Sequence, residues 1–115
     1  MRRGEIRLVD LDPVRGSESN KRRPAVIVSN DSANATAARL GRGVIAVVPV
    51  TSNVSRVLPF QVLLPSDAVG LRVDSKAQAE QVRSVAVEGL GPAVGRVPAQ
   101  VMAQLDDALR LHLQL

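Results

Sequence analysis

Three consecutive cations, Lys21, Arg22 and Arg23, stand directly before Pro24 and the apolar run 25–28. Guanidinium groups bind phosphates well because their rigid fork donates two parallel hydrogen bonds. Pro24 favours an extended backbone at Arg23, so that this side chain leaves the start of a strand in a defined direction. The cluster is therefore either a solvated turn or a place where an anion docks.

Two further groups of polar residues are candidates for the same chemistry. Thr51, Ser52 and Asn53 end the apolar run that begins at residue 44. The second group lies in the segment 75–87 and consists of Gln78, Glu80, Gln81, Arg83 and Ser84. Taken one at a time, these residues also fit a strand-end hydroxyl or an exposed polar face.

Several other kinds of site are excluded by composition. The chain has no cysteine and one histidine, His112, so a thiolate, a Cys-based zinc site and a Ser-His-Asp triad are all out of reach. We expect His112 to be a partly buried structural residue. No glycine-rich phosphate loop is present, and the spacing of the nearby carboxylates does not define a metal site. Those carboxylates are Glu5, Asp10, Asp12 and Glu18. No cofactor is expected.

The net charge of +4 favours an anionic partner. Phe60 is the one aromatic residue among 115, so base stacking on aromatic platforms is nearly excluded. A single-stranded nucleic acid would have to be held by cations, backbone and polar groups. The length suits a single domain, and we find neither a signal peptide nor a membrane-spanning run, which predicts a cytoplasmic protein.

The elements that must position these residues are mostly short strands. Strands are predicted over 4–10, 24–30, 44–51 and 59–65, with the second central in its sheet and Pro49 marking a bulge or an edge in the third. Segment 75–87 suits either a helix or a strand, and we favour a strand. A turn and a short strand follow over 88–98.

Loops and helices fill the remaining segments. Residues 12–22 are predicted to form a long loop, 30–41 one or two helical turns, and 66–71 a turn. An amphipathic helix is expected over 98–113, with Pro98 at its first position. Short strands followed by one helix predict a mainly β fold with a C-terminal helix, arranged as a strongly curved antiparallel sheet or a small barrel.

Six segments in order resemble the MazF/PemK family of toxin endoribonucleases. They are "RRGEIRLVDLDP", "GSE", "RRPAVIVSN", "VVPVTSN", "PFQVLLP" and "EQVRSV", and the final "GRVP…LDDALRLHL" also fits. The resemblance implies a small barrel like the SH3 and plasmid-maintenance toxin folds and a homodimer. It also implies metal-independent, sequence-selective cleavage of single-stranded RNA, and a cognate antitoxin with an acidic tail that covers the RNA groove.

The resemblance also assigns roles to residues. Arg23 matches the family's catalytic arginine and Thr51 its strand-end hydroxyl, while Glu80, Gln81 and Arg83 match a stretch near the substrate. Many relatives carry an aromatic residue where this chain has Arg7. Some plasmid relatives have an arginine and an aspartate where Gln78 and Glu80 stand, so their acid-base pair is not intact here, although Glu80 could still accept a proton.

RNA carries its own nucleophile, the 2′-hydroxyl, so the expected products are a 2′,3′-cyclic phosphate and a 5′-hydroxyl. Arg23 suits the stabilisation of charge on the phosphate, and Thr51 could donate a hydrogen bond to it. Lys21, Arg22, Ser52, Asn53, Gln78, Gln81 and Arg83 are the candidate RNA contacts. The alternatives are a non-catalytic barrel that binds nucleic acid or a partner, and a gyrase-directed toxin of the same fold.

Overall fold

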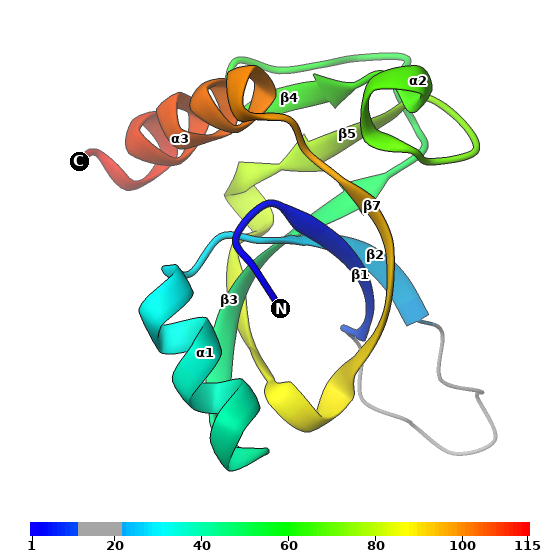
Figure 1. Cartoon of the computed structure of the whole chain (residues 1–115). Helices are drawn as coiled ribbons and strands as arrows, with labels where there is room; N and C mark the ends of the chain where they lie inside the picture. Colours follow the sequence, from blue (N-terminus) through cyan, green and yellow to red (C-terminus); the bar gives the residue numbers. More distant parts are fainter. Residues whose placement is uncertain (12–21) are drawn as a thin grey trace, which may run out of the picture.

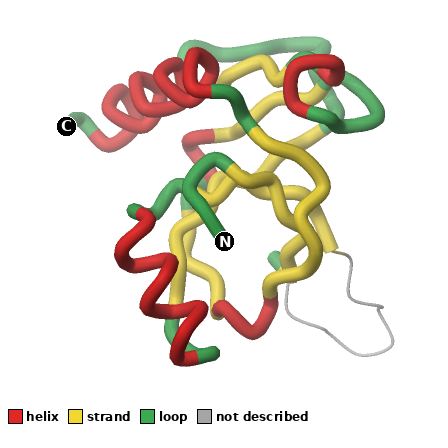
Figure 2. The backbone as a smooth tube through the Cα atoms, viewed as in Figure 1, coloured by secondary structure: helices red, strands yellow, loops and turns green. Residues whose placement is uncertain are grey.

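The computed structural model describes residues 1–11 and 22–115. Lys21 and all of the predicted loop 12–22 except Arg22 lie outside the described residues. Strands dominate and a long helix ends the chain, as predicted (Figures 1 and 2). The strands are β1 (Glu5–Asp10), β2 (Arg22–Ile27), β3 (Val44–Thr51), β4 (Gln61–Leu64), β5 (Ser75–Gln78), β6 (Arg83–Ala86) and β7 (Leu90–Arg96). The helices are α1 (Asp31–Leu40), α2 (Ser66–Val69), α3 (Ala99–Leu113) and the single 3₁₀ turns η1 (Ala79–Gln81) and η2 (Val87–Gly89).

The strands form one antiparallel sheet in the order β4-β5-β3-β2-β1-β7, and β6 pairs with β3 beyond β5. The sheet curves strongly, and Figure 1 shows α3 and α2 near β4 and β5 at one end, and α1 beside β3 at the other. The predicted central position of the second strand is confirmed, since β2 lies between β1 and β3.

Both faces of β2 are buried, which explains its continuous apolar run. Val26 packs into one core cluster with Val48 and Leu105, while Ala25 and Ile27 pack into a second cluster with residues of β1, β3 and β6. Helix α3 closes the first cluster, and Ala37 of α1 joins the second. The curved sheet therefore carries a core on each side.

Pro49 lies inside the sheet, opposite Ala25 of β2, and not at a sheet edge. On the side of β3 that faces away from β2, the partner strand changes. Val50 and Thr51 of β3 pair with β5, whereas residues 44–47 of β3 pair with β6. The turn η1 bulges out of the sheet between these two pairings. Neither β5 nor β6 pairs with residues 48–49 of β3. The hydrogen-bond ladder is therefore interrupted at Pro49, which has no N–H to donate. Segment 75–87 is thus two strands interrupted by η1.

Helix α1 begins and ends at its predicted signals, and its ten residues make it longer than the predicted one or two turns. The side chain of Asn30 caps α1 by accepting from the N–H of Ala33, and Gly41 ends this helix in the left-handed conformation. Pro98 precedes α3 as its N-cap and is not its first residue. The predicted turn 66–71 instead contains the one-turn helix α2.

Helix α2 lies very close to β7. A Cβ at Gly95 would come within 2.4 Å of the carbonyl oxygen of Val69, so a side chain at this position would push α2 away. This close approach fixes the segment that follows α2. No helix in residues 1–11 and 22–115 is both long and apolar enough to cross a membrane.

Candidate functional site

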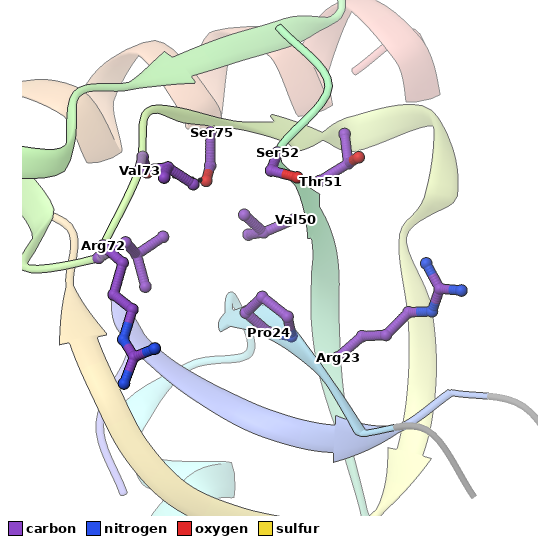
Figure 3. Close-up of a pocket in the computed structure, with 9 residues that line it drawn as sticks. Arg23, Pro24, Val50, Thr51, Ser52, Arg72, Val73 and Ser75 are labelled. Carbon is purple, nitrogen blue, oxygen red and sulfur yellow. Dashed lines mark hydrogen bonds between the residues drawn. The ribbon is translucent and has the colours of Figure 1, made fainter. Parts of the chain in front are cut away.

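A pocket of about 300 Å³ opens where β2 begins and β3 ends. The segment between α2 and β5 forms its opposite side, as Figure 3 shows. The lining residues are Arg23, Pro24, Val50, Thr51, Ser52, Leu71, Arg72, Val73 and Ser75. Two sequence-predicted site residues from separate strands, Arg23 and Thr51, therefore share one pocket.

The sheet register explains why Arg23 and Thr51 meet. Ala25 pairs with Pro49, and continuing this register by two residues on each strand brings Arg23 opposite Thr51. Cross-strand partners project from the same face of a sheet. The polar ends of two buried strands are thus placed together by the apolar pairing behind them.

The Arg23 side chain is exposed and extends away from Pro24 (Figure 3). Within the part of the chain that the structure describes, no hydrogen bond or ion pair engages its guanidinium. Thr51 is half-buried, and its hydroxyl oxygen accepts from the N–H of Asn53 over 3.2 Å. The Thr51 hydroxyl proton remains able to donate. The pair can thus present a cation and a hydroxyl donor to one phosphate.

Ser52 and Asn53 begin the exposed loop 52–60 between β3 and β4. Ser52 lines the pocket, whereas Asn53 lies outside the lining and turns its Oδ1 back to accept from the N–H and hydroxyl of Ser55 over 3.3 and 2.8 Å. The loop therefore starts with an ordered turn whose amide and hydroxyl groups face solvent.

Arg22 points to the other face of β2 and does not line the pocket. Its Nε lies 3.7 Å from Oδ1 of Asp10, the cross-strand partner of Arg22 on β1. A Cβ at Gly91 would lie 2.7 Å from Arg22 Nη1 and 2.9 Å from the carbonyl oxygen of Leu8. The arginine therefore reaches across β1 into space that only a glycine on β7 leaves open.

The remaining predicted residues lie on the other side of β3, outside the pocket lining. Glu80 accepts from Gln61 Nε2 through its Oε2 over 2.7 Å, while its Oε1 is buried and has no hydrogen-bond partner among the described residues. Arg83 donates to the carbonyl oxygen of Leu11. Gln78 ends β5, and Gln81 is exposed on η1. The structure thus separates this group from Arg23 by the width of one strand.

Sequence reasoning missed Arg72 and did not foresee the position of His112. Arg72 is exposed on the rim of the pocket opposite Arg23 (Figure 3). It follows a turn-like segment without periodicity, so nothing local indicated its place. His112 is exposed, not partly buried, and its ring lies 6.5 Å from that of Phe60. The last turn of α3 extends beyond the core, which explains the difference.

Comparison with known proteins identifies the family. A model of the PemK-like, MazF-like toxins of type II toxin–antitoxin systems matches residues 2–113. The chain belongs to this toxin family. The match spans the strands, the pocket and α3, so the resemblance drawn from six short segments is confirmed.

Individual relatives of this MazF-like chain match it over most or all of its length. Endoribonuclease MazF9 of Mycobacterium tuberculosis is 69% identical over 115 residues, which are 100% of this chain and 98% of the relative. The probable endoribonuclease MazF1 of the same organism is 54% identical over 91 residues, or 78% and 98% of the two chains.

A solved structure has the same fold as this MazF-like chain. It is an endoribonuclease from a mycobacterial species in complex with its cognate antitoxin, and it is 26% identical with a TM-score of 0.76. The alignment covers 100% of this chain and 96% of the other. The mainly β fold with a C-terminal helix is thus the toxin fold that the sequence predicted.

Proposed function

We propose that this toxin is a metal-independent, sequence-selective endoribonuclease that cleaves single-stranded RNA and thereby inhibits translation and growth. Residues 1–115 form one toxin domain that acts in the cytoplasm. One observation carries the proposal: Arg23, at the start of β2, and Thr51, at the end of the neighbouring strand β3, line a single pocket. The relative that shares 69% of its residues with this chain is itself named an endoribonuclease.

The reaction begins with the 2′-hydroxyl of the RNA, which attacks the adjacent phosphorus. A 2′-oxygen–phosphorus bond forms, the bond from phosphorus to the 5′-oxygen breaks, and the products carry a 2′,3′-cyclic phosphate and a 5′-hydroxyl. The attacking oxygen loses a proton, and the leaving oxygen gains one. Because the nucleophile belongs to the substrate, the protein needs neither a nucleophilic side chain nor a bound metal to supply one.

Arg23 stabilises the charge that develops on the phosphate oxygens, which is commonly the largest catalytic contribution. Its guanidinium is exposed at the pocket and fits a phosphate with two hydrogen bonds. Thr51 donates its hydroxyl proton to the same phosphate. Arg23 is not assigned as the base, because a guanidinium does not lose its proton at physiological pH.

Glu80 is the proposed proton acceptor. Its carboxylate is oriented by Gln61, and its second oxygen is buried with no protein donor among the described residues. Because this oxygen is buried, the proton of the substrate hydroxyl would reach it through a bridging water. Ser52, Asn53, Gln78, Gln81 and Arg83 contribute RNA contacts around the phosphate, and Lys21 and Arg22 contribute charge along the backbone.

The proposed assembly is a homodimer that a cognate antitoxin inhibits through an acidic C-terminal tail. Support comes from family membership and from the solved relative that was captured with its cognate antitoxin. An acidic tail would meet the exposed Arg23 and Arg72 on opposite rims of the pocket. The same cations that attract RNA would then attract the inhibitor.

The deciding experiment incubates purified protein with a long RNA in excess EDTA and maps the ends of the products. Arg23→Ala is expected to lower cleavage by at least about 1,000-fold, because one lost donor to a developing oxyanion costs about 100- to 1,000-fold and here the charge is lost as well. Arg39→Ala is the matched control, since Arg39 is an exposed arginine on α1 away from the pocket.

Discrete cuts with 2′,3′-cyclic ends in the wild type and in Arg39→Ala, and their absence in a folded Arg23→Ala protein, would support the proposal. Cleavage that persists in Arg23→Ala would contradict the assigned site. A folded wild-type protein that cuts none of several RNAs would instead favour a non-catalytic or gyrase-directed role.

A further inference from the structure

Lys76 is a buried cation that the proposed reaction does not use. Only 9% of the surface of Lys76 is accessible to solvent, and its Nζ donates to the carbonyl oxygen of Arg56 over 2.6 Å. A lysine head group is rarely buried, because it must give up its hydration shell. The carbonyl oxygen of Arg56 therefore supplies the acceptor that this buried ammonium group needs.

The position of Lys76 in the sheet brings it next to the candidate site. Lys76 pairs with Thr51 of β3 on one side and with Leu63 of β4 on the other. Because cross-strand partners share a face, Lys76 projects from the same face as Thr51. The loop 52–60 begins directly after Thr51, and Lys76 bonds to its backbone at residue 56.

The same loop is held at other points by uncharged groups. Near its start, Thr51 accepts from the N–H of Asn53 over 3.2 Å, and Asn53 accepts from Ser55. Near its end, Gln61 Oε1 accepts from the N–H of Leu58 over 2.9 Å. Between these two ends, the hydrogen bond from Lys76 to the Arg56 carbonyl oxygen holds the middle of the loop. Without it, the middle of the loop would keep few described contacts to the sheet.

We propose that Lys76 is a positioning residue that sets the RNA sequence selectivity of this toxin, which rests on the proposed function. Its bond to Arg56 fixes the loop that presents Ser52, Asn53 and Arg56 beside the scissile phosphate. Their exposed hydroxyl, amide and guanidinium groups can read the edges of unstacked bases. Arg23 lies on β2 and not on this loop, so the cation that binds the scissile phosphate does not depend on the bond between Lys76 and Arg56.

The test compares Lys76→Met with wild type, because methionine fills much of the same space without a donor. We measure kcat/KM on the preferred RNA and on RNAs with one base changed near the cut. The ratio between them is expected to fall by about 10-fold or more in Lys76→Met, since the base contacts loosen while the phosphate contacts remain. The products should still carry 2′,3′-cyclic ends.

Two further variants serve as controls. Lys76→Arg keeps a charged donor and is expected to retain most of the selectivity. Asn34→Ala is a matched control for lost stability: Asn34 is fully buried on α1, bonded to Ser29 and far along the chain from the loop. It should lower the Tm and leave the selectivity ratio unchanged. If Lys76→Met does not fold, Lys76→Gln, which is too short to reach the Arg56 carbonyl, replaces it.

A second measurement separates this proposal from the proposed function. Hydrogen exchange at the amides of Asn53, Ser55 and Leu58 needs no RNA, and it should become faster in Lys76→Met. Unchanged exchange, or an unchanged selectivity ratio in a folded variant, would overturn the role of Lys76. If exchange is faster in Lys76→Met but the wild type cuts no RNA, the result would support the role of Lys76 in holding the loop and would contradict the proposed nuclease activity.

Discussion

Gln61 orients the carboxylate of Glu80: its Nε2 donates to Glu80 Oε2 over 2.7 Å, while its own Oε1 accepts from the N–H of Leu58 over 2.9 Å. The Leu58 N–H can only donate, so it fixes which end of the amide faces Glu80. One side chain at the start of β4 thus joins the loop 52–60 to the carboxylate that we propose as proton acceptor.

This relationship predicts the effect of Gln61→Leu. Leucine has a similar size but donates nothing to Glu80 Oε2, so the carboxylate loses the bond that orients it. RNA cleavage should therefore fall, by no more than in Glu80→Gln, where the loss of a general base costs about 100- to 10,000-fold. Single-turnover cleavage rates of the two variants and the wild type measure this. Wild-type rates in a folded Gln61→Leu protein would argue against Glu80 as the acceptor.

Arg22 is predicted to contribute charge to RNA binding without taking part in cleavage. It is exposed, only loosely paired with Asp10 at 3.7 Å, and outside the pocket that holds Arg23. If it contacts one phosphate, Arg22→Ala should reduce the slope of log K against log salt concentration by about 0.7. Binding titrations of labelled single-stranded RNA at several salt concentrations measure this slope. A slope equal to that of wild type would show that Arg22 does not contact a phosphate and is a solvated residue at the start of its strand.

The contact between α2 and β7 predicts a loss of stability in Gly95→Ala. The added Cβ would meet the Val69 carbonyl oxygen at 2.4 Å, a distance that real Cβ atoms do not tolerate. Overpacking of this kind lowers the free energy of unfolding by about 1–3 kcal/mol. Urea unfolding measures the change. Gly89→Ala is the matched control, because a Cβ there meets nothing within 4 Å. Equal losses in both variants would show that the steric contact is unimportant.

Glu5 predicts a specific pH dependence of stability. Burial raises the pKa of its carboxyl, but the Arg2 N–H at 3.1 Å, the amino terminus and Arg7 outweigh this effect and hold the pKa below its ordinary value. The folded state then binds this proton less readily than the unfolded state. The resulting stabilisation is present above about pH 4.3 and is lost as the pH falls through the lower pKa of the folded protein.

Glu5→Gln should therefore be less stable than wild type near neutral pH and should lose less stability on acidification. Urea unfolding at a series of values from about pH 7 to about pH 3 checks this. Parallel curves for the two proteins would show that Glu5 does not contribute to the acid sensitivity.

Local signals predicted the strands, the caps of α1 and the position of α3, because apolar runs and capping residues act over a few neighbours. The interruption of segment 75–87 by η1 could not be predicted locally, since it depends on where β3 exchanges one partner for another. Pro49 was a correct sign of irregularity, but the irregularity lies in the partner strands.

The site was predicted in the same uneven way. Arg23, at the start of one obvious strand, and Thr51, at the end of another, could be named because they match residues of the family that the sequence resembles. Gln61 and Lys76 were overlooked. Gln61 stands inside the strand-like run 59–65, where a polar residue is itself a signal of a buried contact, whereas Lys76 stands among the mostly polar residues 75–81 and carries no such signal. Their partners, Glu80 and Arg56, are 19 and 20 residues away in the sequence, so only the folded chain reveals what they hold.

Gly91 imposes a restriction on evolution that no ligand contact would reveal. The missing side chain on β7 leaves the space through which Arg22 crosses β1. A larger residue here would displace the flexible guanidinium of Arg22, and its Cβ would also meet the carbonyl oxygen of Leu8 at 2.9 Å. The backbone of β1 cannot yield as a side chain can, so glycine at position 91 is required by the spacing of β1 and β7 whatever residue stands at position 22.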